Sequence, residues 1–160
     1  SSSSAASDVY KRQEKDYKTS AISTDPINHE KMVRARQQKI DSIATDIPLL
    51  KVSGDSSADL LVVGWGGTYG HLYSAVEAMN AEGKPVAFAH FNYINPLPAN
   101  TEEILRRYKK VVVCELNNGQ FASYLSGKVP GVNFLRYNKI QAQPFMVSEL
   151  MAHFSKLLEE

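Results

Sequence analysis

A glycine-rich loop is the first place where this sequence has residues suited to binding a ligand. It reads GWGGTYG over 64–70 and directly follows the apolar run LLVV at 60–63. Glycines allow the backbone to approach a phosphate closely, and the start of a helix attracts an anion. The match to the dinucleotide fingerprint is poor, because Tyr69 stands where the third glycine belongs and no acid follows the second strand. Two interpretations stay open: a tight strand-to-helix turn, or an anion-binding loop.

Two further loops have an unusual composition and follow predicted strands. They read NYINPLP over 92–98 and ELNNGQ over 115–120, whereas the loops before the strands are ordinary turns. In an open parallel sheet, ligands bind beyond the carboxyl ends of the strands, near a switch in strand order. The aromatic residues equally suit a protein interface. The candidates for either role are Gly64, Gly66, Gly67, Thr68, Tyr69, Gly70, Asn92, Tyr93, Asn95, Glu115, Asn117, Asn118, Gly119 and Gln120.

Single reactive side chains point to little chemistry. Cys114 lies inside an apolar run and is interpreted as a core residue rather than a nucleophile. Glu115 ends a predicted strand, where a structural role is favoured over that of a base. His71 is expected on the surface and His90 half-buried, and the four histidines lack metal-site spacing such as HExxH. No GxSxG elbow is present. The sequence therefore predicts no catalytic residue and no metal site.

The elements that would position these loops alternate in type. A helix is predicted over 28–47, capped by Asn28 or Asp25 and stopped by Pro48, and a loop over 51–59. Strands alternating with helices imply a mostly parallel sheet with helices on both faces, a three-layer α/β domain. The expected strands cover 60–65, 85–91, 111–116 and 132–137, and the expected helices cover 70–82, 101–109, 119–127 and 147–158.

Composition limits the class of protein. The 160 residues suit one domain with or without a tail, and 43% hydrophobic with 22% charged residues is close to the globular norm. A net charge of +1 argues against nucleic-acid binding. One cysteine excludes an intrachain disulfide and suits a reducing compartment. No apolar run reaches the roughly 20 residues of a membrane helix. We expect a soluble, cytoplasmic domain that binds neither nucleic acid nor membrane.

The first residues are set apart from the fold. Residues 1–13 are polar and serine-rich, lack an initiator methionine and contain AASDVYKRQ, which resembles translated sequencing-adapter read-through. We interpret them as an artefact or tag, with a native disordered tail as the alternative. The chain is then expected to be a fragment of a longer protein.

Several longer strings together resemble one enzyme family. They are HEKMVRARQQKID at 29–41, DLLVVGWGGTYG at 59–70, FNYINPLPANTEEILRRYKKVVVCELNNGQFASYL at 91–125 and NKIQAQPFMVSEL at 138–150. In this order they resemble the C-terminal region of the alpha subunit of 2-oxoacid:ferredoxin oxidoreductases, with 2-oxoglutarate:ferredoxin oxidoreductase (2-oxoglutarate synthase) as the nearest branch. The resemblance covers nearly everything after residue 14.

The resemblance implies an activity that composition does not reveal. Such enzymes oxidatively decarboxylate a 2-oxoacid, transfer the acyl group to coenzyme A, release CO2 and reduce ferredoxin. Their cofactors are thiamine diphosphate with magnesium and iron–sulfur clusters. The matching region would be a transketolase C-terminal-like α/β domain over 51–160, preceded by an interdomain segment and linking helix over 14–50. Its partners would be the beta subunit and the missing N-terminal domain of alpha, and ferredoxin through the complex.

Two functions are therefore open. The first is a non-catalytic assembly domain of that oxidoreductase, because no catalytic residue of the family maps onto this chain and iron–sulfur ligands would need several cysteines. The isolated chain is then expected to be inactive and to hold no cofactor. The second is a stand-alone Rossmann-like domain that binds a small molecule or nucleotide at the 64–70 loop.

Overall fold

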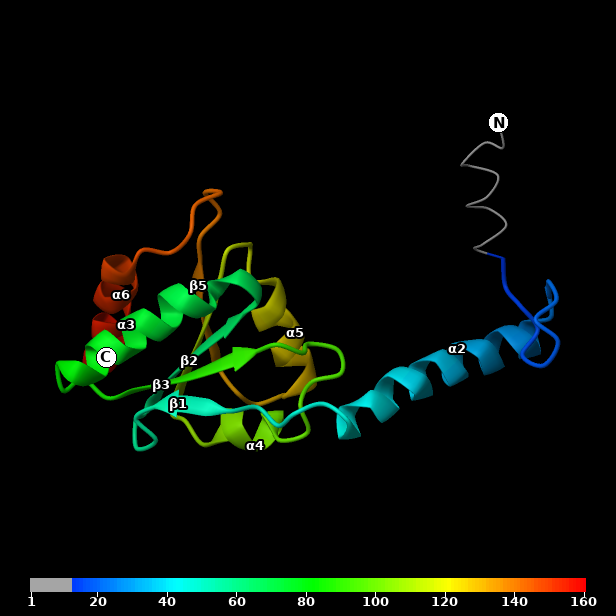
Figure 1. Cartoon of the computed structure of the whole chain (residues 1–160), viewed down its shortest axis with the longest axis horizontal. Helices are drawn as coiled ribbons and strands as arrows, with labels where there is room; N and C mark the ends of the chain where they lie inside the picture. The colour runs from blue at the N-terminus through cyan, green and yellow to red at the C-terminus, as the bar shows by residue number, and fades with distance from the viewer. Residues whose placement is uncertain (1–12) are drawn as a thin grey trace. The chain divides into compact units, whose positions relative to one another are not determined.

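The computed structural model describes residues 13–160, which fall into two units that separate between Asp46 and Ile47 (Figure 1). The prediction for residues 1–13, an artefact or a tail, lies outside the described residues except for its last position.

The second unit is built on one five-stranded sheet in the order β1-β3-β2-β4-β5. The strands are β1 (Val52–Gly54), β2 (Leu60–Trp65), β3 (Val86–Phe91), β4 (Lys110–Glu115) and β5 (Phe134–Asn138). Strands β2 to β5 run parallel, and β1 pairs antiparallel with β3. The apolar runs in β2 and β4 are buried on both faces, as the central strands of a parallel sheet must be. The prediction of a mostly parallel sheet is confirmed.

Helices cover both faces of this sheet (Figure 1). They are α3 (Tyr69–Ala81), α4 (Thr101–Arg106), α5 (Gln120–Lys128) and α6 (Val147–Glu159). Helices α3 and α6 pack with one set of alternate strand residues, such as Leu60 and Val62, into one buried cluster. Helices α4 and α5 pack with the other set, such as Leu61 and Val63, into a second. The three-layer α/β architecture is thus confirmed, and its two cores lie on opposite faces of the sheet.

One segment differs from the expectation, and the start of the last helix agrees with it although the residue before that start is an unfavourable cap. The segment 51–59 was predicted as a loop, but it contains β1, which is only three residues long and has no alternating pattern to reveal it. Met146 is a poor cap by residue type, yet α6 begins after it, because the Glu149 carboxylate accepts the Met146 N–H at 2.9 Å. The same carboxylate oxygen pairs with Lys139 Nζ at 2.6 Å. A side chain inside the first turn therefore supplies the cap.

The first unit consists of helix α2 (Pro26–Ser42), a short 3-10 turn η1 (Ile43–Thr45) and the segment before them. The observed helix thus begins two residues before the predicted start at residue 28. Together α2 and η1 end at Thr45, before Pro48. Asp25 is its cap, because its Oδ1 accepts the Ile27 N–H at 3.0 Å, and Pro26 occupies the first turn. Asn28 has a different role: it is the buried residue of the helix.

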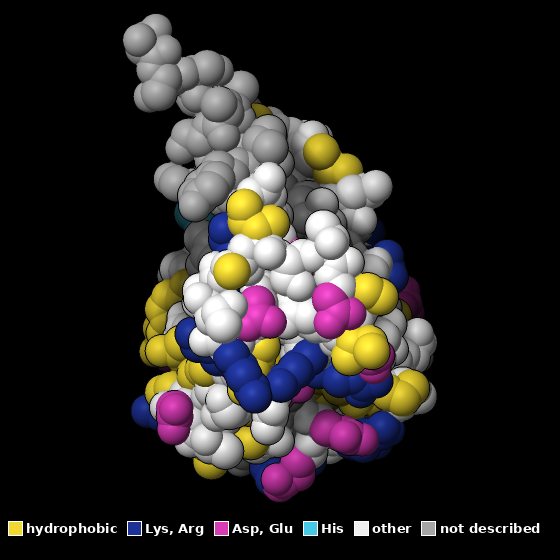
Figure 2. Space-filling model, turned by 90° about the vertical axis from the view of Figure 1, so that its right-hand side faces the viewer, with side chains coloured by type: hydrophobic (Ala, Val, Ile, Leu, Met, Phe, Trp, Pro, Cys, Tyr) yellow, Lys and Arg dark blue, Asp and Glu magenta, His cyan; other side chains and the backbone are white. Residues whose placement is uncertain are grey.

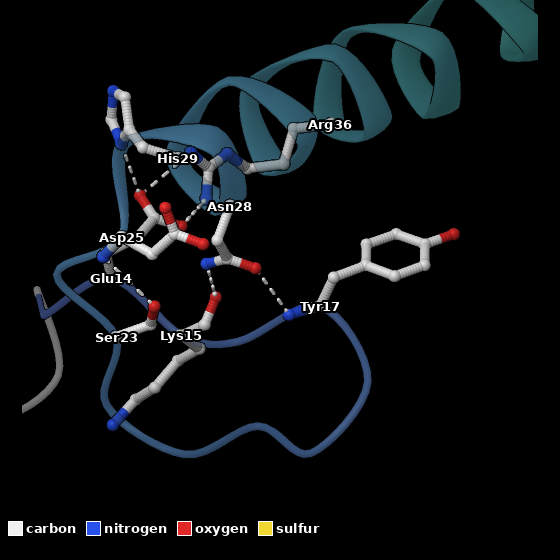
Figure 3. A network of polar contacts seen from close by, with 8 residues as sticks. All are labelled: Glu14, Lys15, Tyr17, Ser23, Asp25, Asn28, His29 and Arg36. Atoms are coloured by element: carbon white, nitrogen blue, oxygen red, sulfur yellow. Dashed lines mark hydrogen bonds and ion pairs between the residues drawn. The ribbon is translucent and has the colours of Figure 1, made fainter.

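Asn28 ties the segment before α2 to the helix (Figure 3). Its Oδ1 accepts the Tyr17 N–H at 2.9 Å, and its Nδ2 donates to the Lys15 carbonyl at 2.9 Å. Glu14 reaches the same helix, where it contacts His29 Nδ1 at 3.0 Å and Arg36 Nη1 at 3.3 Å. These contacts hold residues 14–17 against α2 although the unit buries little apolar surface.

Candidate functional site

The carboxyl ends of β2 and β4 meet at the point where the strand order reverses. From β2 the chain proceeds to β3 on one side and then to β4 on the other, so β2 and β4 are neighbours at the switch. Trp65 is the last residue of β2 and Glu115 is the last residue of β4. An open parallel sheet presents its ligand site here, and two of the predicted loops do meet at this place.

Glu115 occupies the switch point as a fully buried carboxylate, with 0% of its surface exposed. Its Oε1 accepts the Phe121 N–H at 2.8 Å and the Trp65 Nε1–H at 3.2 Å, and its Oε2 accepts the Ala122 N–H at 3.0 Å. Two of these donors are first-turn amides of α5, whose positive end favours a negative charge. Glu115 therefore caps α5 from inside the domain.

The loop between β4 and α5 is closed by a second cap. Asn117 Oδ1 accepts the N–H groups of Gly119 at 2.8 Å and Gln120 at 3.1 Å. Gly119 has a φ of +83°, and a Cβ there would lie 2.9 Å from Asn138 Nδ2, so glycine is required. The first-turn amides of α5 are consequently occupied by protein oxygens, and this helix start offers no free donors to an anion.

The glycine loop after β2 forms a short 3-10 turn, η2 (Gly66–Thr68), which leads into α3. Thr68 is buried, and its hydroxyl donates to the Trp65 carbonyl at 2.9 Å. A Cβ on Gly64 would lie 2.4 Å from Leu72 Cδ1, so this glycine allows α3 to pack on β2. Gly66 has a φ of +58°, which favours glycine at the turn. The tight-turn interpretation thus accounts for Gly64 and Gly66.

A hollow with a volume of about 670 Å³ lies beside the glycine loop. The residues that line it are Lys51, Val52, Ser53, Gly66, Tyr69, Phe88, His90 and Asn92. Burial lowers the pKa of His90, and a backbone hydrogen bond with Gly66 partly opposes that effect. His90 Nδ1 is buried without a partner, and it lies 3.4 Å from the position of a Cβ on Gly64, beneath the loop. His90 is thus a neutral packing residue of the hollow wall.

A smaller hollow of about 230 Å³ lies between the second and third loops. Its lining is mostly apolar and consists of Trp65, Ile94, Asn95, Gln120, Phe121 and Tyr124. Trp65 and Phe121 are in ring contact, with centroids 5.8 Å apart. Ile94, Tyr93 and Leu116 remain 38%, 45% and 40% exposed around this edge. Apolar side chains left in water beside an apolar hollow are typical of a surface that another polypeptide covers.

The structure thus brings most of the predicted site residues to one edge of the sheet but does not assemble them into a catalytic group. Asn118 is exposed and lines none of the hollows described above. Cys114 is buried in the core, where desolvation and the neighbouring Glu115 raise the pKa of its thiol. Across residues 13–160, no three His, Cys, Asp or Glu side chains gather in a way that suits a metal ion.

On the face drawn in Figure 2, basic and acidic side chains are interspersed, with hydrophobic side chains among them. This face therefore lacks the uniformly basic patch that is typical of a nucleic-acid-binding surface. Within the described part of the chain, none of the helices is both long and apolar enough to cross a membrane.

Sequence reasoning missed several residues of this edge: Lys51, Trp65, Ile94, Phe121 and Tyr124. Trp65 stands between the candidates Gly64 and Gly66, and a lone tryptophan at a strand end is a signal for an interface. Phe121 and Tyr124 fall within the helix predicted over 119–127, and only the packing of α5 beside the second loop shows that they line a hollow. Lys51 was missed together with β1.

Comparison with known proteins identifies relatives of this chain. It is 45% identical over 130 residues to the 2-oxoglutarate oxidoreductase subunit KorA of Mycobacterium tuberculosis, a match that covers 81% of this chain and 19% of KorA. It is 30% identical over 137 residues to subunit alpha of the 2-oxoacid:ferredoxin oxidoreductase 1 of Aeropyrum pernix, covering 81% of this chain and 21% of that subunit. No family model matches the chain.

Solved structures agree with these relatives. The 2-oxoglutarate:ferredoxin oxidoreductase from Magnetococcus marinus, solved with 2-oxoglutarate, coenzyme A and succinyl-CoA bound, superposes with a TM-score of 0.81 at 26% identity. The superposition covers 91% of this chain and 26% of that one. A split-gene transketolase, an inactive beta4 tetramer, shares the fold with a TM-score of 0.50 at 14% identity, over 68% of this chain and 41% of its own. The resemblance to alpha subunits of 2-oxoacid:ferredoxin oxidoreductases is confirmed, and the chain spans about one fifth of the curated relatives' length.

Proposed function

We propose that this chain is part of the alpha subunit of a 2-oxoglutarate:ferredoxin oxidoreductase and serves there as an assembly domain. The 45% identity to a 2-oxoglutarate oxidoreductase subunit over most of the chain supports the family and favours 2-oxoglutarate as the substrate. The complete enzyme would decarboxylate the 2-oxoacid, pass the acyl group to coenzyme A and deliver a pair of electrons to ferredoxin. It would act in the cytoplasm, together with a beta subunit.

The residues present do not fit the cofactors of such an enzyme. Iron–sulfur clusters are held by several cysteines, whereas this sequence has one, Cys114, which is buried in a core. Magnesium and the diphosphate of thiamine diphosphate need oxygen ligands and exposed donors. Glu115, the carboxylate at the switch point, is already bound by three protein N–H groups. We therefore assign the cofactors to other parts of the complex and derive no step of the reaction from these residues.

One observation supports the interface role: at the edge where such a sheet would bind a ligand, the Glu115 and Asn117 side chains of the third loop are used as internal caps, and apolar side chains are left exposed. Glu115 and Asn117 cap α5. Tyr93, Ile94 and Leu116 are exposed along this edge, and Ile94 lines the mostly apolar hollow. A domain that bound its own substrate would keep polar groups free at this position. The divisions at 14–50 and 51–160 remain part of this proposal; along the chain, the structure's own division into two units falls between Asp46 and Ile47.

Activity assays with and without the rest of the enzyme test the proposal. The purified chain is expected to show no 2-oxoglutarate-dependent reduction of ferredoxin and no binding of thiamine diphosphate by calorimetry. Restoring the coding sequence upstream of Glu14 and co-expressing the beta subunit is expected to give a complex that has both properties. Turnover by the purified chain alone would contradict the assembly role.

The alternative, a small-molecule or nucleotide domain, has one observation in its favour: the 670 Å³ hollow is lined by Lys51, Asn92 and the glycine loop. It predicts that the isolated chain binds NAD or another nucleotide at micromolar concentration and that Gly66→Val abolishes the binding. Circular dichroism of this variant would show whether it is folded. An absence of nucleotide binding by the folded wild-type chain would remove this alternative.

A further inference from the structure

Lys51 is a lysine of the α/β unit that has no acid partner. Lys84, Lys109 and Lys139 each contact a carboxylate oxygen, at 3.0, 2.7 and 2.6 Å. The Lys51 ammonium forms neither an ion pair nor a hydrogen bond with any residue in 13–160. It is exposed and lines the hollow of about 670 Å³, which we call the Lys51 hollow, and no aspartate or glutamate lines this hollow. The hollow therefore holds one positive charge that the described residues do not balance.

Two neutral polar side chains share the hollow with Lys51 and also lack partners. Ser53 lies in β1 and Asn92 follows β3, and neither side chain is hydrogen-bonded within the part of the chain that the structure describes. Asn80 and Asn100, in contrast, are both bonded to backbone groups of the unit. A hydroxyl and an amide beside an ammonium group are donors from which an acid group can accept hydrogen bonds. The three side chains are thus free to bind an external anion.

The pairing of β1 with β3 brings these groups to one side of the sheet. The antiparallel register places Val52 opposite Ala89 and Ser53 opposite Phe88. Ala89 belongs to the core beneath α4 and α5, whereas Phe88 belongs to the core beneath α3 and α6. Successive residues of a strand face opposite sides, so Lys51 and Ser53 both lie on the α3 side. Their convergence is therefore a product of the strand register and not of a surface charge run.

Aromatic rings give the same hollow an apolar wall. Tyr69, Phe88 and His90 all line it. The ring centroid of Tyr69 lies 5.1 Å from that of His90 and 5.8 Å from that of Phe88. Tyr69 is 50% exposed, so part of its surface is open to a ligand. A hollow of this volume, with an apolar wall and a few convergent polar groups, has the composition of a small-molecule site.

We propose that the Lys51 hollow binds a small organic anion that carries a single acid group on an apolar body. Lys51, Ser53 and Asn92 donate to the acid group, and the Tyr69 ring contacts the apolar body. One cation balances one acid group, whereas the two phosphates of a dinucleotide would leave a negative charge without a partner. The ligand class is thereby different from the nucleotide of the alternative function.

This site is additional to the assembly role and does not rest on it. The Lys51 hollow shares no lining residue with the mostly apolar hollow of Trp65, Ile94 and Phe121. A polypeptide on the apolar hollow and a small anion in the Lys51 hollow therefore use different residues. An assembly domain can carry such an accessory site, and a failure of either proposal leaves the other standing.

The first experiment tests the ligand class by NMR titration of the purified chain. Phenylacetate and phenyl phosphate carry the same ring with a carboxylate or a phosphate, and at least one is expected to bind with a Kd of about 1 mM or lower. The tighter of the two identifies the acid group. The amide signals of Lys51, Ser53 and Asn92 are expected to shift. Neutral phenylacetamide and ringless acetate are expected to bind about tenfold more weakly. Binding of neither acid, or equal binding of phenylacetamide or acetate, would overturn the inference.

The second experiment tests the contacts with variants of the same chain. Lys51→Met is expected to weaken binding of the preferred acid about tenfold, and Asn92→Ala about threefold. Lys156→Met is the matched control, because Lys156 is an exposed lysine of α6 that has no ion pair among the described residues and does not line the Lys51 hollow. Both lysines are exposed, so circular dichroism is expected to show folded variants. Equal affinities in Lys51→Met and Lys156→Met, or amide shifts that gather away from the hollow, would refute the site.

Discussion

Replacing Glu115 with glutamine is expected to destabilise the α/β unit by about 2–4 kcal/mol. The carboxylate accepts three N–H groups, from Phe121, Ala122 and Trp65, at 2.8, 3.0 and 3.2 Å. Glutamine offers one oxygen and one NH2 group, so at least one buried donor of the three faces another donor and costs about 1–3 kcal/mol. The remaining bonds lose the charge, which removes about 1 kcal/mol more.

The size of this effect decides between two roles for Glu115. Domains of this kind have a stability of about 5–15 kcal/mol, so the variant is expected to stay folded and measurable. Urea unfolding followed by the fluorescence of Trp65, the sole tryptophan, reports directly on the altered site. The indole N–H resonance is expected to shift as well, because Trp65 loses a charged acceptor.

The matched control is Glu102→Gln on α4. Glu102 forms an exposed i,i+4 pair with Arg106 at 2.9 Å, and such pairs contribute at most about 0.5 kcal/mol. A loss of stability in Glu115→Gln no larger than in this control would refute the capping role. Glu115 would then be a carboxylate held in place for another purpose, and the assignment of a non-catalytic domain would lose its main support.

Three further predictions concern separate parts of the chain. Gly64→Ala is expected to lower the stability by about 1–3 kcal/mol in denaturant unfolding, because its Cβ would lie 2.4 Å from a side-chain carbon of α3. Asn28→Ala is expected to release the segment before α2, seen as faster hydrogen exchange of the Tyr17 amide; unchanged exchange would argue against this anchor. Burial lowers the pKa of His90 and His153 from 6.5, so both favour the neutral form in the folded state. Their contribution to stability is present above pH 6.5 and is lost as the pH falls. In the double variant His90→Gln/His153→Gln, the melting temperature is expected to change less than in the wild type between about pH 7.5 and 5.5.

Much of the architecture follows from local pattern. The runs at 60–63 and 111–114 are apolar at every position, and a strand buried on both faces needs this. Helix α3 was predictable because Leu72, Val76 and Met79 recur on one face. Local patterns report which face of an element is buried, and a parallel sheet with two helical layers follows from their alternation. The likeness to 2-oxoacid:ferredoxin oxidoreductases was also readable from four strings of residues in order.

Only the tertiary structure decided what the strand-end residues do. The sequence predicted a structural role for Glu115 from its place at a strand end, but its partners are Trp65, 50 residues away, and the amides of α5, which it meets only because β2 and β4 are neighbours. The short strand β1 exists through pairing with β3, since three residues have too little pattern to predict a strand. Hydrogen bonds between distant residues depend on strand order and register, which the periodicity of a single element does not contain. For this reason the sequence located the edge of the sheet, and the fold alone separated its internal caps from its exposed surface.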